Sequence, residues 1–183
     1  MNAASDTELL SLRSTAKKND AFAEIYRRHG DAVMGFAFRL SGSRSLAEDL
    51  CQEVFTRLAL SPPEKCTTLR PWLLRVTRNL FIDQRRRRML DIDRMRDLAL
   101  WPRASHPSPE LAFDGSSKLG RVEGALQRLP LGLREAIVLV CMQELSAAEA
   151  AEVLETSVEA VRQRVARGRS RLRLALQEEN AEG

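Results

Sequence analysis

Apolar residues recur every three or four positions along nearly the whole sequence, the spacing that places them on one face of an α-helix. Valine and isoleucine are too scattered to build β-strands. The periodicity fails only between residues 99 and 118, where prolines, serines and a glycine interrupt it. The sequence therefore predicts an all-α fold of two small helical domains joined by a flexible linker.

The linker divides the chain into predicted domains at residues 1–98 and 119–183. In the first domain, Asp20 is expected to cap a helix that ends at Ser41, and Ser45 with Glu48 is expected to form a capping box for the next helix. The apolar side expected before Ser41 comprises Phe22, Ile25, Tyr26, His29, Val33, Phe36, Ala37 and Leu40.

The last helix of the first domain is expected to begin near Pro71, which a first helical turn tolerates, and to run into the basic block Arg85–Arg88. Its expected core face comprises Trp72, Leu73, Val76, Leu80 and Phe81. In the second domain, a stripe that begins at Leu119 predicts a helix ending near Pro130, and residues 133–142 predict a buried helix.

A helix-turn-helix unit is predicted next. Ser146 and Glu149 have the spacing of a capping box, the pattern breaks at Glu155, and a second helix begins near Val158. That second helix has no acidic residue between positions 162 and 173 and carries Arg162, Arg164, Arg167, Arg169, Arg171 and Arg173. A run of charge is often only a solvated face. Because this run lacks compensating acids and follows a helix-turn, we favour nucleic-acid binding.

Other classes of function find little support in the sequence. Three cysteines, Cys51, Cys66 and Cys141, are too widely spaced for a disulfide framework or a metal knuckle, and they are expected to be reduced structural thiols rather than a redox switch. His29 and His106 form no metal-binding motif, so no metal or cofactor is expected. The sequence shows no catalytic constellation, no membrane-spanning run and no secretory signal, which favours a cytoplasmic protein that is not an enzyme.

Three segments together resemble a known family. The stretch LSAAEAAEVLETSVEAVRQRVARGRSRLR at 145–173 resembles the domain of sigma factors that reads the promoter minus-thirty-five element. The stretches AEDLCQEVFTRL at 47–58 and LRPWLLRVTRNLFIDQRRRR at 69–88 resemble the polymerase-docking and minus-ten segments of the extracytoplasmic-function sigma factors. A sequence with these segments in this order is identified as a member of that family, of the sigma-70 type.

The resemblance implies that the helix around residues 45–59 docks on a basic surface of core RNA polymerase. Polar and acidic side chains share one side of that helix, opposite its leucines, at Glu48, Asp49, Gln52, Glu53 and Thr56. An ordinary solvated face would look the same, and only the motif favours docking. Leu46 stands where the family commonly has an acidic residue, so some docking charge is missing.

By the same resemblance, the next helix captures the unpaired minus-ten strand. The residues that share this face, Trp72, Arg75, Asn79, Asp83 and Arg86, recur at helical spacing, with Asn79 and Asp83 at the base-reading positions. Trp72 and Phe81 could stack on bases if they were exposed, although aromatic residues at this spacing usually belong to the core. The block Arg85, Arg86, Arg87 and Arg88 would contact duplex phosphates.

In the second domain, the resemblance places Arg162, Gln163 and Ala166 against the major groove and Arg164, Arg167 and Arg169 toward the DNA backbone. The family usually has glycine where this chain has Glu155, so the turn is expected to differ slightly or to be strained.

The implied partners are RNA polymerase core, promoter DNA and an anti-sigma factor, with no insertion into a membrane. The alternative is a helix-turn-helix regulator that acts alone.

Overall fold

The computed structural model describes residues 5–11, 18–63, 68–97 and 118–181. Within these ranges every regular element is helical, so the all-α prediction is confirmed, and no helix there is long and apolar enough to cross a membrane. The elements are α1 (Asp6–Ser11), α2 (Lys18–Ser41), α3 (Arg44–Leu60), α4 (Leu69–Asp97), α5 (Lys118–Arg128), α6 (Leu131–Ile137), a π-helical turn (Val138–Met142), α7 (Ala147–Leu154) and α8 (Val158–Ala181).

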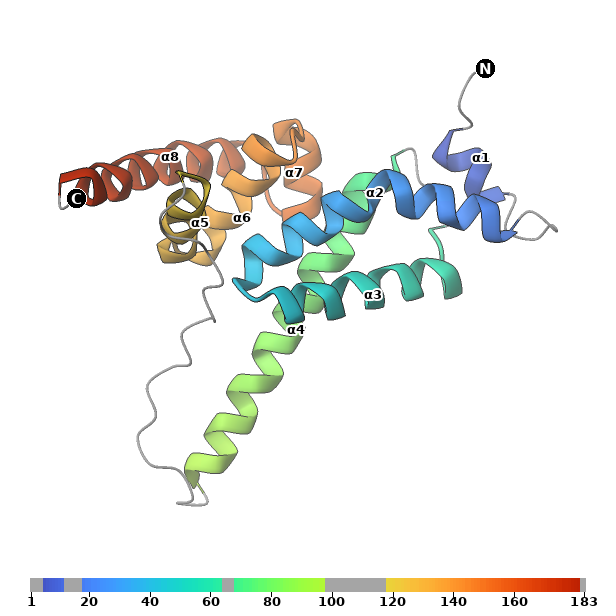
Figure 1. Cartoon of the computed structure of the whole chain (residues 1–183), viewed down its shortest axis with the longest axis horizontal. Coiled ribbons are helices and arrows are strands. Elements are labelled where there is room, and N and C mark those ends of the chain that lie inside the picture. The colour runs from blue at the N-terminus through green and yellow to red at the C-terminus, as the bar shows by residue number, and fades with distance from the viewer. Residues whose placement is uncertain (1–4, 12–17, 64–67, 98–117, 182–183) are drawn as a thin grey trace.

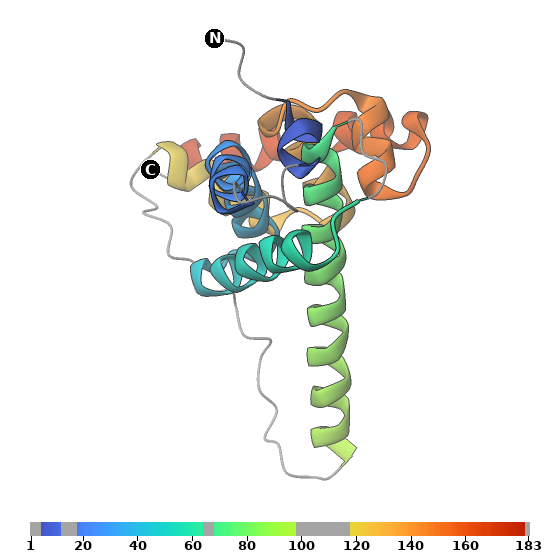
Figure 2. The same cartoon turned by 90° about the vertical axis from the view of Figure 1, so that its right-hand side faces the viewer.

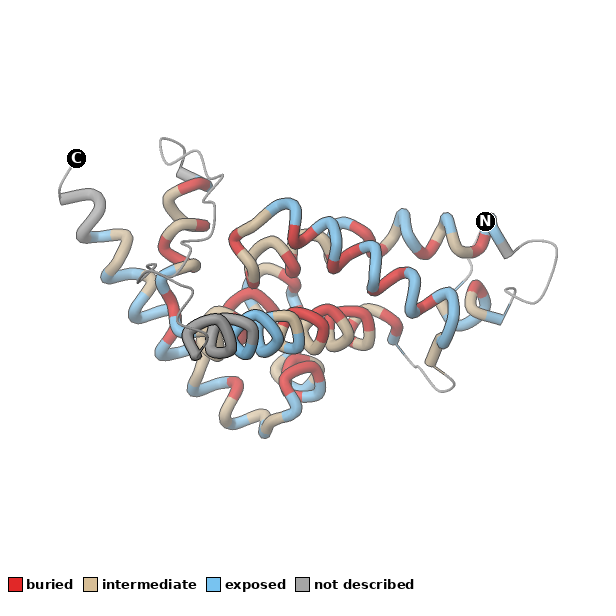
Figure 3. Tube along the Cα trace, turned by 90° about the horizontal axis from the view of Figure 1, so that it is seen from below, coloured by how far each residue is buried: buried red, intermediate tan, exposed pale blue. Residues whose placement is uncertain are grey.

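The first half of the chain is built on three long helices (Figure 1). Helices α2 and α3 pack side by side, and α4 packs against both. Their apolar stripes meet in a core that includes Phe36, Val54 and Leu73, all fully buried. Figure 3 shows buried residues where these helices face one another and exposed residues on their outer sides. Hydrophobic burial of the three stripes therefore holds this half together.

Three details of α2 and α3 differ from the sequence-based predictions. Helix α2 begins at Lys18, so Asp20 lies inside its first turn and is not the cap. Tyr26 is 51% exposed, although its ring packs 4.7 Å from that of Phe55, centroid to centroid. Helix α3 is capped by Ser43, whose hydroxyl accepts a hydrogen bond from the Leu46 amide at 3.3 Å.

The proposed capping box of Ser45 with Glu48 is therefore wrong. Ser43 has the extended backbone that an N-cap requires, with φ −124° and ψ 125°, because Gly42 before it turns the chain with φ 70°. Helix α3 can consequently begin at Arg44, and Ser45 lies within its first turn.

Helix α4 runs without a break from Leu69 to Asp97 and extends well beyond α3 (Figure 2). Its first part is buried among α2, α3 and α7, whereas Arg85 and the residues that follow as far as Leu90 are exposed. The basic block therefore lies on a helix that projects from the body of the molecule.

The second half of the chain is a smaller helical unit. Helix α6 packs against α8 and leads into the π-helical turn, while α5 also contacts α8. The stripe that predicted α5 is only partly buried, because Leu119 is 64% exposed at the start of that helix. Of the predicted linker, residues 99–117 lie outside the described residues, and Lys118 already belongs to α5.

The two halves also pack against each other. Helix α7 contacts α4, and α5 and α6 contact α2, so buried apolar side chains of both halves form one continuous cluster. The sequence predicted two small helical domains, and nothing in its local pattern indicates how they meet. The contact between them is a tertiary feature of the fold.

Candidate nucleic-acid interface

The helix-turn-helix consists of α7, a three-residue turn and α8. Ser146 caps α7 through a complete capping box, with its hydroxyl 3.2 Å from the Glu149 amide and its own amide 2.8 Å from the Glu149 carboxylate, as predicted. The chain turns at Glu155, which is left-handed with φ 52° and ψ 49°. Ser157 then accepts a hydrogen bond from the Ala160 amide at 3.1 Å and so caps the first turn of α8.

The inner side of α8 is apolar, since Val161 and Val165 are buried against α7 and α6. Gly168 lies on the same side, and a Cβ atom there would come within 2.7 Å of the Ile137 side chain. The missing side chain thus lets α8 lie close to α6 and sets how the basic helix is presented. A glycine inside a helical pattern is the sequence signal that indicates such a close approach.

The outer side of α8 carries most of the predicted DNA-contacting residues. Those exposed are Arg162, Gln163, Ala166, Arg167 and Arg169, and Arg171 and Arg173 further along the helix are exposed as well. Arg164 differs from them, because it is only partly exposed and lies near Glu135. Burial raises the pKa of the Glu135 carboxyl, and the charges of Arg78 and, less strongly, Arg164 oppose this rise. The structure therefore brings Arg162, Gln163 and Ala166 onto one open surface and turns Arg164 toward the interior.

Glu159 is an acidic residue on this surface that the sequence analysis missed. Its carboxylate accepts a hydrogen bond from Gln163 Nε2 at 3.4 Å and lies 3.9 Å from Arg162 Nη1. Glu159 lies three residues before Arg162, a spacing that brings side chains together on a helix. This spacing is the sequence signal that predicts the contact between them. One exposed carboxylate therefore lies beside two of the residues predicted to face the major groove, Arg162 and Gln163.

A second exposed surface runs along α3. Its predicted residues, Glu48, Asp49, Gln52, Glu53 and Thr56, are all exposed, opposite the buried Leu50, Val54 and Leu58. Glu48 is paired with Arg44 at 3.0 Å and Glu53 with Arg57 at 2.8 Å, whereas Asp49 has no ion pair among the described residues. Exposed ion pairs of this kind contribute little stability, so the glutamates can leave Arg44 and Arg57 and pair with basic residues of a partner.

The face of α4 is continuous because the helix is unbroken, so Arg75, Asn79 and Asp83 share one side. Arg75 and Asn79 are partly exposed and Asp83 is exposed. Trp72 is half-buried against the apolar core, and Phe81 is 4% exposed, so Phe81 is a core residue and not a stacking platform.

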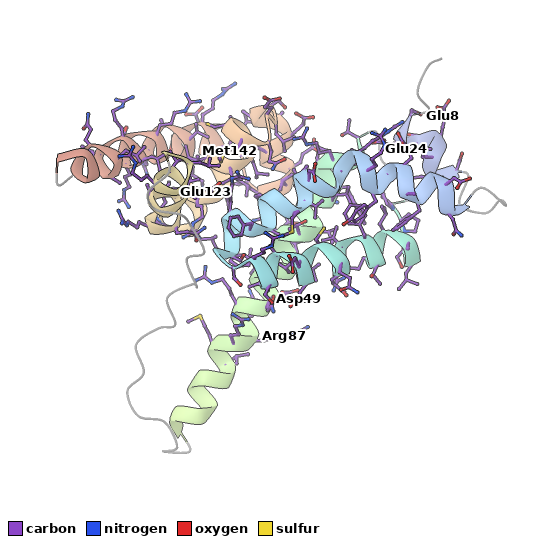
Figure 4. The ribbon with its side chains drawn as sticks, in the orientation of Figure 1. Glu8, Glu24, Asp49, Arg87, Glu123 and Met142 are labelled. Carbon is purple, nitrogen blue, oxygen red and sulfur yellow. The ribbon has the colours of Figure 1, made fainter. Side chains whose placement is uncertain are left out.

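Below this face the basic block continues along α4, and the residues Arg85, Arg86, Arg87 and Arg88 are all exposed. The Arg85 guanidinium lies 5.8 Å from the centre of the Phe81 ring. Figure 4 places Asp49 on α3 and Arg87 on the projecting part of α4, so the acidic and basic surfaces of the first half are distinct. Four adjacent guanidinium groups on a projecting helix suit contacts to phosphates.

The cysteines lie in different surroundings. Cys51 is buried, and burial raises the pKa of its thiol, as expected for a structural residue. Cys141 was expected in a buried helix, but it is exposed, because the π-helical turn carries it to the surface beside Arg169, whose Nη2 atom is 3.3 Å from Sγ. Cys66 and His106 lie outside the described residues.

Two family models match the chain. The model described as Sigma-70 region 2 matches residues 25–90, which include α3 and the first part of α4. The model described as Sigma-70, region 4 matches residues 119–172, which include the helix-turn-helix. The two matches fall on the two halves that the helical patterns separate.

The chain is also similar to proteins named as RNA polymerase sigma factors. The chain is 38% identical over 165 residues to the ECF RNA polymerase sigma factor SigE of Mycolicibacterium smegmatis, covering 87% of this chain and 63% of SigE. It is 33% identical over 180 residues to the RNA polymerase sigma factor NccH of Alcaligenes xylosoxydans xylosoxydans, covering 93% of this chain and 94% of NccH. The similarity thus extends over nearly the full length of NccH.

Two solved structures share the fold. The sigma factor RpoE in complex with the anti-sigma factor NepR, from Bartonella quintana, has a TM-score of 0.70 and 28% identity, covering 85% of this chain and 96% of RpoE. CnrH in complex with the cytosolic domain of CnrY has a TM-score of 0.69 and 27% identity, covering 94% of this chain and 97% of CnrH. The two matched regions and the shared fold define a transcription initiation factor with two sigma regions. The chain belongs to the sigma-70 family, as an RNA polymerase sigma factor of the extracytoplasmic-function type.

Proposed function

We propose that three exposed helix faces of this sigma factor divide the work of promoter recognition. The acidic face of α3 docks on core RNA polymerase, the Asn79 and Asp83 face of α4 captures the minus-ten strand, and α8 reads the minus-thirty-five element. The observation that supports this division most directly is the placement of charge: the acidic face and the two basic surfaces lie on different helices.

On α8, the proposal separates base contacts from phosphate contacts. Arg162 and Gln163 project from the beginning of the helix, where a recognition helix meets base edges, and Arg167 and Arg169 follow where the backbone passes. Glu159 makes only weak, exposed contacts with the first two residues, so bases can replace it. A regulator that acts alone is not supported, because the first half also matches a sigma region.

Docking on the polymerase is tested by reversing charge on α3. The variant Asp49→Lys with Glu53→Lys replaces two exposed acids, so it should lower the affinity for core polymerase by about tenfold or more without disturbing the fold. The variant Asp31→Lys with Glu152→Lys makes the same change in net charge at exposed positions elsewhere and serves as the control. Equal core binding by both variants in a pull-down would exclude the α3 face as the docking surface.

The wider role follows from the same assignment. A chain with these faces acts in the cytoplasm as an initiation factor rather than as an enzyme, and its predicted regulator is an anti-sigma factor. Two similar structures, RpoE with NepR and CnrH with the cytosolic domain of CnrY, are complexes of that kind. Run-off transcription with core polymerase and genomic fragments tests this role, since a sigma factor yields discrete transcripts only when core polymerase is present.

A further inference from the structure

Glu159 shares one face of α8 with the residues predicted to face the major groove. Helix α8 begins at Val158, so Glu159 lies in its first turn, and the Glu159 side chain is 67% exposed. Arg162, Gln163 and Ala166 follow it at the spacing that places side chains on one side of a helix. The face that is proposed to read the minus-thirty-five element therefore begins with a carboxylate.

Glu159 lies at the end of α8 where a recognition helix contacts bases. Residues near the N-terminal end of such a helix reach the base edges. The first turn is regular, because Ser157 accepts hydrogen bonds from the Ala160 amide through its hydroxyl and from the Val161 amide through its carbonyl oxygen, both at 3.1 Å. With a rise of about 1.5 Å per residue, Glu159 lies about 4.5 Å before Arg162 along the helix axis. This distance is close to the rise of about 3.4 Å between base pairs, so the two side chains can reach neighbouring base pairs.

The contacts of Glu159 within the chain leave its carboxylate able to accept further hydrogen bonds. Oε1 accepts from Gln163 Nε2 at 3.4 Å, which is a long hydrogen bond, and Oε2 lies 3.9 Å from Arg162 Nη1, beyond hydrogen-bonding distance. An ionised carboxylate can accept about four hydrogen bonds. The carboxylate of Glu159 therefore keeps acceptor capacity on the exposed side of α8.

A carboxylate distinguishes base edges because it accepts hydrogen bonds and donates none. In the major groove, cytosine presents only its N4 amine, which is a donor. Guanine presents two acceptors, thymine presents an acceptor and a methyl group, and adenine presents an acceptor beside its amine. Glu159 therefore matches cytosine best, whereas the guanidinium of Arg162 matches guanine.

An acidic residue at a DNA surface weakens binding unless a base compensates for its charge. The phosphates repel the carboxylate, and an acceptor atom on the facing base adds to this repulsion. The amine of cytosine replaces the repulsion with a hydrogen bond. Glu159 is therefore expected to act mainly by excluding the wrong bases, which is a common source of specificity.

An acid in the first turn of a helix also has a structural explanation, because it interacts favourably with the helix dipole. In α7, Glu149 has such a role and completes the capping box. In α8, Ser157 supplies the capping contact, and the carboxylate of Glu159 contacts side chains on the exposed face. These contacts favour a role for Glu159 on that face.

We propose that Glu159 is a specificity-determining residue of α8: its carboxylate accepts a hydrogen bond from the amine of a cytosine in the minus-thirty-five element and disfavours other bases at that position. The cytosine belongs to the base pair next to the one that Arg162 contacts. This inference rests on the proposed function, because it requires α8 to read that element.

The test selects promoters from a library with a randomised minus-thirty-five element, using holoenzyme assembled from core polymerase and each variant. The wild-type chain should enrich cytosine at one position, and Glu159→Ala should reduce that enrichment about fivefold or more. Glu159→Gln has nearly the same shape and should shift the preference at that position toward adenine, because an amide both donates and accepts. Arg162→Ala should relax the preference at the neighbouring position instead.

The matched control is Glu152→Gln, which removes an exposed acid from α7 of the same helix-turn-helix. It should leave the base preference unchanged at every position. Unfolding of each variant, followed by circular dichroism, measures any loss of helix stability separately, since a weaker dipole interaction lowers the unfolding midpoint without changing base preference.

Loss of the cytosine preference in Glu159→Ala, with the preference at the Arg162 position retained, supports the proposal. Unchanged preferences, or an equal change in binding to every sequence, would overturn it, because the carboxylate then acts only through its charge or through helix stability. Relaxation of the same position by Glu159→Ala and Arg162→Ala would also overturn it, because the acid then only orients Arg162. If wild-type holoenzyme enriches no sequence in this element, the proposed function of α8 is itself wrong.

Discussion

Glu155 stores backbone strain in the turn of the helix-turn-helix, and glycine should release it. The residue has φ 52° and ψ 49°, and the amide groups of Glu155 and Thr156 both donate to the carbonyl oxygen of Ala151, so the cap fixes this conformation. A side chain in the left-handed region costs about 1–2 kcal/mol, and glycine loses about 0.5–1 kcal/mol through extra freedom of the unfolded chain. Glu155→Gly should therefore stabilise the protein by about 0.5–1 kcal/mol.

Urea unfolding followed by circular dichroism measures this difference in the free energy of unfolding. The matched control is Glu152→Gly, which makes the same chemical change at an exposed position inside α7 and should destabilise by about 1 kcal/mol. The two variants should therefore move the unfolding midpoint in opposite directions. A midpoint for Glu155→Gly at or below that of the wild type would refute the strain argument.

Three further predictions concern the proposed surfaces and the buried thiol. Asn79→Ala and Asp83→Ala should each reduce promoter melting more than closed-complex formation, and normal permanganate footprints for both would contradict the strand-capturing role of α4. Arg162→Ala should cost about 1–3 kcal/mol on the best promoter and relax preference at one base pair. Arg167→Ala should instead weaken all promoters alike and reduce the salt slope by about one ion, so identical effects of the two changes would reduce α8 to an electrostatic anchor. Because burial raises its pKa, Cys51 should resist alkylation in the folded holoenzyme, and rapid labelling there would count against a structural thiol.

Much of the fold followed from local pattern. The spacing of apolar residues predicted α2, α3 and α7 closely, because a stripe repeating every three or four residues can be buried only as a helix. The capping box at Ser146 and the turn at Glu155 were also predicted, since both depend on residues within a few positions of one another. The exposure of the predicted faces on α3 and α8 follows from the same periodicity.

Predictions from residue spacing were wrong where the local backbone conformation decides the outcome. The sequence predicted Ser45 as the cap of α3, but Ser43, which follows the left-handed Gly42, is the N-cap. Cys141 was placed in the core by its apolar neighbours, yet the π-helical turn carries it to the surface.

The sequence by itself determined the helices, the helix-turn-helix, the two family regions and the charged faces, because each depends on residues close together in the chain. Only the tertiary structure decided how the halves meet. Arg39 and Glu123, or Arg78 and Glu135, are too far apart in sequence for any periodicity to connect them. They pair because docking α5 and α6 on α2 and α4 removes their charges from water, and a buried charge needs an opposite charge beside it.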